Sequence, residues 1–125
     1  MGRRVMAFAS TAKYVTKSLD VASTDSASPD DLYVCPNNFV CLVKFLHLSN
    51  SAANNKKISV YWYEAATTTH HYIVDNFASD ANSMHEVIEG GGYLALQPGD
   101  KLQCFAETTL TYHVTMSGEE HFQPT

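Results

Sequence analysis

From Leu32 onward, short apolar runs alternate with turn-forming residues, and no window keeps a helical period beyond a turn or two. The segment 39–50 is apolar at both parities, as expected of a central strand that is covered on both faces. Alternation in 109–118 predicts that Leu110, Tyr112, Val114 and Met116 point inward. The expected strands cover residues 32–35, 39–50, 58–65, 67–78, 84–89, 93–96, 101–107 and 109–118. This pattern predicts an all-β fold with two antiparallel sheets packed as a sandwich of jelly-roll type.

Residues 1–31 have a different character, with few large apolar side chains and a closing run of turn formers, ASTDSASPDD. We expect an extended N-terminal arm that carries one strand near Lys13–Leu19, followed by a Ser/Asp/Pro loop. Residues 32–125 then form the sandwich, and 125 residues suit one such unit.

Charge is distributed unevenly. Arg3, Arg4, Lys13 and Lys17 precede every acidic residue, and the rest of the chain has 4 basic against 13 acidic residues, a balance of −9. An acidic body argues against nucleic-acid binding, which needs clustered Lys and Arg, whereas a basic arm can lie on an acidic neighbour such as another copy of this chain.

The chain has no apolar stretch near the roughly 20 residues that cross a bilayer, and the apolar segment VMAFA is shorter than a signal-peptide core. The expectation is a soluble protein with no membrane partner. Three cysteines, Cys35, Cys41 and Cys104, form no C-x-x-C pair, which favours buried thiols and synthesis in a reducing cytosol. The redox state of Cys35 and Cys41, which flank a short turn, stays open.

The segment HEVIEGGGYLALQPGD resembles the glycine turn and Pro-Gly-Asp turn of cupin metalloenzymes. The cupin ligand set does not follow, because His70 and His71 are adjacent and point to opposite faces of a strand. That leaves His85, Glu86 and His113 as the residues of a cupin-like alternative. No Gly-x-Ser-x-Gly elbow is present, so we expect no enzyme activity, no catalytic residue, no metal and no cofactor.

Taken in order, AKYVTKSLDV, LYVCPNNFVCLVKFLHLSN, KKISVYWYEA, HHYIVDN, LALQPGDKLQCFAE and a last strand ending in VTMSGEE resemble small β-sandwich virion proteins of tailed bacteriophages. The resemblance covers about nine tenths of the chain and rests on the succession of strands and turns. It implies a structural protein of the virion, made in the host cytoplasm, with no catalytic residues.

Within that group, the resemblance favours a capsid decoration or cement protein, with a neck, tail or fibre-attachment protein as the alternative. The implied partners are copies of the chain itself, with a trimer favoured, and the major capsid protein or neck and tail proteins. A carbohydrate- or receptor-binding module that uses the aromatic run from Tyr61 to Tyr63 is a further alternative. The residues expected at interfaces are Arg3, Arg4, Lys13, Tyr14, Lys17, Tyr61 and Tyr63.

Overall fold

The computed structural model describes residues 12–88 and 90–123, and this part of the chain consists of nine strands without a helix. The strands are β1 (Ala12–Asp20), β2 (Asp30–Val34), β3 (Phe39–Asn50), β4 (Lys56–Glu64), β5 (Thr69–Ser79), β6 (Ser83–Ile88), β7 (Leu94–Leu96), β8 (Lys101–Ala106) and β9 (Tyr112–Phe122).

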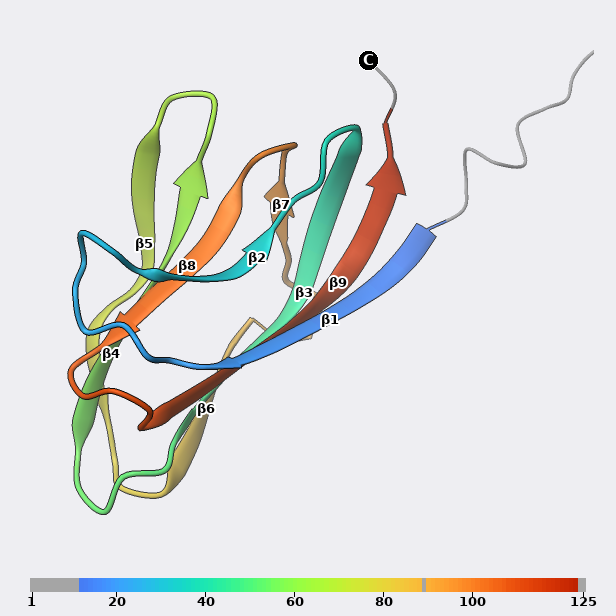
Figure 1. The fold of residues 1–125 in the computed structure, drawn as a ribbon. Helices are drawn as coiled ribbons and strands as arrows, with labels where there is room; N and C mark the ends of the chain where they lie inside the picture. The colour runs from blue at the N-terminus through green and yellow to red at the C-terminus, as the bar shows by residue number, and fades with distance from the viewer. Residues whose placement is uncertain (1–11, 89, 124–125) are drawn as a thin grey trace, which may run out of the picture.

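The strands form two antiparallel sheets that pack face to face (Figure 1). The first sheet has the order β1-β9-β3-β6, with the short β7 also paired to β3, and the second has the order β2-β8-β4-β5. Leaving β7 aside, eight strands are divided four and four, with the first strand beside the last and the second beside the next to last. This is the topology of a jelly roll. The predicted all-β sandwich is confirmed.

The strand expected within the N-terminal arm is β1, and it belongs to the first sheet. All nine of its residues pair with β9, from Ala12 opposite His121 to Asp20 opposite His113. Val21, directly after it, is fully buried in the core. In the described part of the chain, the sandwich therefore begins at Ala12 rather than at Leu32, and the residues from 22 to 29 are the loop that joins its two sheets.

The last strand starts later than the alternation predicted. Leu110 is 59% exposed and has a positive φ of 60°, so it lies in the turn before β9 instead of inside. Tyr112, Val114 and Met116 are buried as expected, and the inward series continues through Gly118 to Glu120.

Gly118 lets β9 approach β3 very closely. A Cβ at this position would overlap the carbonyl oxygen of Leu42, and the register of β3 shifts between Val43 and Phe45 at the same level. Only glycine leaves room for two backbones at this separation. The core itself is apolar and lies between the sheets, with Leu46, Leu48, Val60 and Leu102 among its fully buried members.

Candidate functional site

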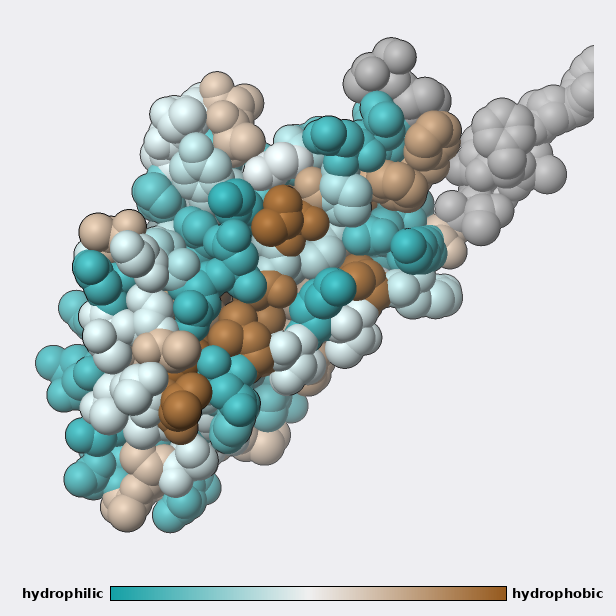
Figure 2. All heavy atoms as spheres, viewed as in Figure 1, coloured by the Kyte–Doolittle hydropathy of each residue, from teal (hydrophilic) through white to brown (hydrophobic). Residues whose placement is uncertain are grey.

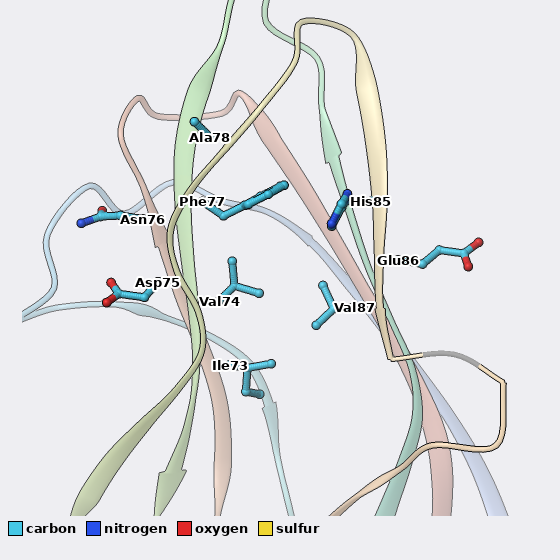
Figure 3. Close-up of a pocket in the computed structure, with 9 residues that line it drawn as sticks. All are labelled: Ile73, Val74, Asp75, Asn76, Phe77, Ala78, His85, Glu86 and Val87. Carbon is cyan, nitrogen blue, oxygen red and sulfur yellow. The ribbon is translucent and has the colours of Figure 1, made fainter.

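The three residues of the cupin-like alternative do not converge. His85 lies opposite the buried Leu48 and points between the sheets, where its ring packs on Phe77 with 4.5 Å between ring centroids. Glu86 points away from this space (Figure 3), and His113 is on the outer face, where it contacts Asp20. Within residues 12–88 and 90–123, no group of three or more His, Cys, Asp or Glu side chains could hold a metal ion.

The Pro-Gly-Asp turn has a structural use for its carboxylate. Asp100 is only 1% exposed and accepts three hydrogen bonds, from Trp62 Nε1, from the backbone N–H of Ala65 and from that of Gln97, at 3.0–3.1 Å. These bonds fix the turn against the β4–β5 hairpin. Because all three donors belong to the protein, the residue that resembled a cupin feature supports the fold.

One buried polar contact ties the two sheets together near β1 and β2. The Tyr33 hydroxyl on β2 donates to Glu120 Oε2 on β9 at 2.5 Å, and Glu120 is 5% exposed. Burial, together with this hydrogen bond, raises the pKa of Tyr33 far above its ordinary value. The contact joins strands from opposite sheets, so its role is to hold the sandwich closed.

The three thiols are free and buried. Burial raises the pKa of Cys35 to about 11 and that of Cys104 to about 12, and it also raises the pKa of Cys41. A thiol is nucleophilic as its thiolate, so these cysteines are held in the unreactive form. They act as small apolar residues of the core.

A second polar contact ties the sheets at the far end of β5. The hydroxyl of Tyr112 on β9 lies 2.6 Å from Ser79 Oγ and donates to the Lys56 carbonyl at 2.8 Å. Sequence alternation identified Tyr112 as an inward side chain, but it carried no information about which strand would supply its polar partners.

The expected interface residues fall into three groups. Arg3 and Arg4 lie outside the described residues. Lys13, Tyr14 and Lys17 are all exposed on β1, the edge strand of the first sheet, and Tyr14 is 79% exposed on the outer face. Tyr61 and Tyr63, on β4, form the third group and have different surroundings.

Tyr61 is buried within its own chain, with 2% of its surface exposed. The rings of His70 and Tyr72 lie edge-on to it, and its hydroxyl donates to the Ser26 carbonyl of the β1–β2 loop. Tyr63 is half-buried beside His70. Trp62 packs against the core on the opposite face. The aromatic run 61–63 therefore forms no continuous stacking platform for a sugar. Tyr61 is already covered by residues of its own chain.

One cavity among the described residues was not singled out from the sequence. It is a cleft of about 550 Å³ between β5 and β6, the edge strands of opposite sheets. In Figure 3, Ile73, Val74 and Phe77 point from β5 toward His85 and Val87 on β6. Apolar residues are visible in both segments of the sequence, but their placement across an open side of the sandwich depends on which sheet each strand joins.

Comparison with known proteins adds no relative to this description, because no family model and no curated protein matches the chain. Within residues 12–88 and 90–123, no helix is long and apolar enough to span a membrane.

Proposed function

We propose that this chain is a non-enzymatic structural protein of a tailed-phage virion, and that it decorates or cements the capsid. The resemblance in strand succession supports this role, and so does the jelly-roll topology, an architecture shared by viral capsid proteins, lectins and cupins. The buried carboxylates described above bond to groups of the protein itself, and the thiols are buried, which favours a structural role over chemistry.

The observation that carries the proposal is the character of the β1 edge. It presents Tyr14 to solvent on the outer face, and Lys13 and Lys17 are exposed on the inward side of the same strand, on a body that carries a charge of −9. Tyrosine is enriched in protein interfaces, and two lysines give the edge a charge complementary to an acidic partner. A second copy of this chain, with its acidic body, is a partner of that kind, and an acidic patch on a capsomer would be another.

The direct test is to purify the particles produced by the genome that carries this gene and to quantify the chain in them by mass spectrometry. A decoration protein is expected in a fixed ratio to the major capsid protein, whereas a neck or tail protein is expected in a few copies per particle. Absence of the chain from intact particles would contradict the proposal.

The mass of the purified chain in solution gives a second test. Light scattering is expected to show a closed oligomer, with a trimer favoured, and the same sample is expected to contain no bound metal. A monomer or dimer that carries stoichiometric metal would instead favour the cupin-like alternative.

Tyr14→Ser probes the β1 edge without touching the core, because the side chain is mostly exposed. The variant is expected to fold normally and to bind stripped particles at least 10-fold more weakly than the wild type. Tyr93→Ser is the matched control, since Tyr93 is similarly exposed but lies in the connection before β7. Equal binding by both variants would exclude the β1 edge as the contact.

A further inference from the structure

The cleft between β5 and β6 has the form of a docking site for an extended segment. Both strands are the last in their sheets, and in the described part of the chain neither pairs with a strand on its outer edge. An edge strand offers a row of free N–H and C=O groups, which an added strand can satisfy. β5 has a positive φ at Asn76 and two register shifts toward β4, whereas β6 has one register shift toward β3, at Val87.

The lining of the cleft specifies the chemistry of its occupant. Side chains that point into it are mainly apolar, and the outward side chains of Asp75 and Glu86 lie along its two rims (Figure 3). None of the lining residues is Lys or Arg. The occupant should therefore be apolar where it enters the cleft and basic beside the rims.

Residues 3–9 of this chain, RRVMAFA, have that composition. Two arginines precede five apolar residues, and in an extended strand Met6 and Phe8 point to the same side. A seven-residue segment also matches the six residues of β6 in length. These residues lie outside the described part of the chain.

The cleft of the same copy is out of reach. Ala12 lies opposite His121, which lies opposite Val40, whereas His85 lies opposite Leu48. Ala12 and His85 are therefore about eight residues apart along the strand direction, at about 3.3 Å per residue. They are also three strands apart across the sheet, at about 4.8 Å per strand. Together these give a separation of roughly 30 Å between Ala12 and His85. Four residues from Phe8 to Ala12 span at most about 14 Å.

We propose that residues 3–9 of one copy bind along β6 in the cleft of a neighbouring copy, with Met6 and Phe8 inserted and the arginines beside Asp75 and Glu86. Such a contact is heterologous, and it closes into a ring if the rotation between copies allows it. This contact specifies how copies would assemble, and it rests on the proposed function only in the assumption that copies of the chain associate.

Complementation between two full-length variants tests the exchange. Phe8→Asp removes the inserted side chain but leaves the cleft intact, and Val87→Asp blocks the cleft but leaves the segment intact. Each variant alone is expected to dissociate about 10- to 100-fold more readily than the wild type, the range expected for losing one buried apolar side chain. An equimolar mixture is expected to form one-to-one pairs, because each pair retains one intact segment and one intact cleft.

Controls separate a loss of binding from a loss of folding. Leu110→Asp changes an exposed apolar residue outside the cleft and should keep the wild-type mass. If Val87→Asp fails to fold, Asp75→Lys with Glu86→Lys replaces it, since both side chains are exposed. That variant should dissociate readily, and a chain with Arg3→Glu and Arg4→Glu should restore association when mixed with it.

Three results would overturn the inference: a wild-type chain that is monomeric, a Phe8→Asp chain that keeps the wild-type mass, or a mixture that stays monomeric. The middle result, combined with a monomeric cleft variant, would assign the cleft to a different occupant. A monomeric wild-type chain would also fail the solution-mass test of the proposed function, whereas the other two results leave the virion role to the presence of the chain in particles. Conversely, segment exchange by a chain that is absent from particles would remove the virion role alone.

Discussion

The sandwich has two open sides, at β1–β2 and at β5–β6, and their edge strands differ in how they are protected against pairing with another strand. On the first side, the inward face of β1 alternates lysine with apolar residues: Lys13, Val15, Lys17 and Leu19 lie opposite the inward residues of β9. Figure 2 shows this side, with apolar surface between β1 and β2 in a line broken by hydrophilic residues. Inward-pointing charges on an edge strand oppose the addition of another strand.

The β5–β6 side has no such protection. The side chains that point into its cleft are mainly apolar, the lining has no lysine or arginine, and neither edge pairs with a further strand in the described part of the chain. The comparison indicates that one side of the same jelly roll is built against strand addition and the other is suited to it. Side-chain contacts through Tyr14 remain possible on the first side, since they do not require pairing with the β1 backbone.

The largest effect on stability is expected at Gly118. This residue lies on β9, the strand that pairs with both β1 and β3. Gly118→Ala places a methyl group against the Leu42 carbonyl, so the backbones of β9 and β3 must separate. We expect a loss of about 3 kcal/mol in the free energy of unfolding, as for overpacking a rigid site. Urea denaturation of the variant and the wild type measures it.

Gly91→Ala is the matched control for this substitution. An added Cβ at Gly91 meets no atom within 4 Å. Its effect should stay within about 0.5 kcal/mol. If both variants lost the same free energy of unfolding, the close approach of β9 to β3 would not explain why residue 118 must be glycine.

The two polar contacts between the sheets are expected to contribute unequally to the free energy of unfolding. Tyr33→Phe leaves the buried carboxylate of Glu120 without its donor and should lower the free energy of unfolding by about 2 kcal/mol. Tyr112→Phe, near the β5 end, leaves a neutral hydroxyl and a carbonyl and should cost about 1 kcal/mol. Chemical denaturation at pH 7 ranks them, and the reverse order would show that the Glu120 carboxylate finds another donor.

Alkaline pH should lower the stability of the fold, and Cys35, directly after β2, should account for part of this loss. Burial raises the pKa of Cys35 from 9.0 to about 11, so its neutral form stabilises the fold below pH 9, and this stability is lost as the pH rises toward 11. The expected loss is about 1 kcal/mol per pH unit in that window. Cys35→Ala should show a smaller slope of unfolding free energy against pH than the wild type, and an unchanged slope would contradict the assignment.

The sequence predicted the number, order and approximate bounds of the strands because alternation and turn residues are local signals. The bounds failed where a local backbone conformation decided them, as with the positive φ of Leu110. The sequence also singled out the aromatic run from Tyr61 to Tyr63, but the loop that covers Tyr61 comes from a segment 35 residues earlier. The cleft between β5 and β6 depends on the assignment of strands to sheets, which periodicity does not encode.

The smallest expected effect on stability, and the most direct test of the two-sided comparison, comes from Lys17→Val. Because Lys17 is exposed on an edge strand, its replacement should change the free energy of unfolding by less than about 0.5 kcal/mol. It should nevertheless promote association through β1, since it removes one of the two inward-pointing charges of this edge. Light scattering over a concentration series should show species larger than the wild type, whereas Lys57→Val on the interior strand β4 should leave the mass unchanged. If Lys17→Val also left the mass unchanged, the lysines of β1 would not be what keeps this edge from pairing.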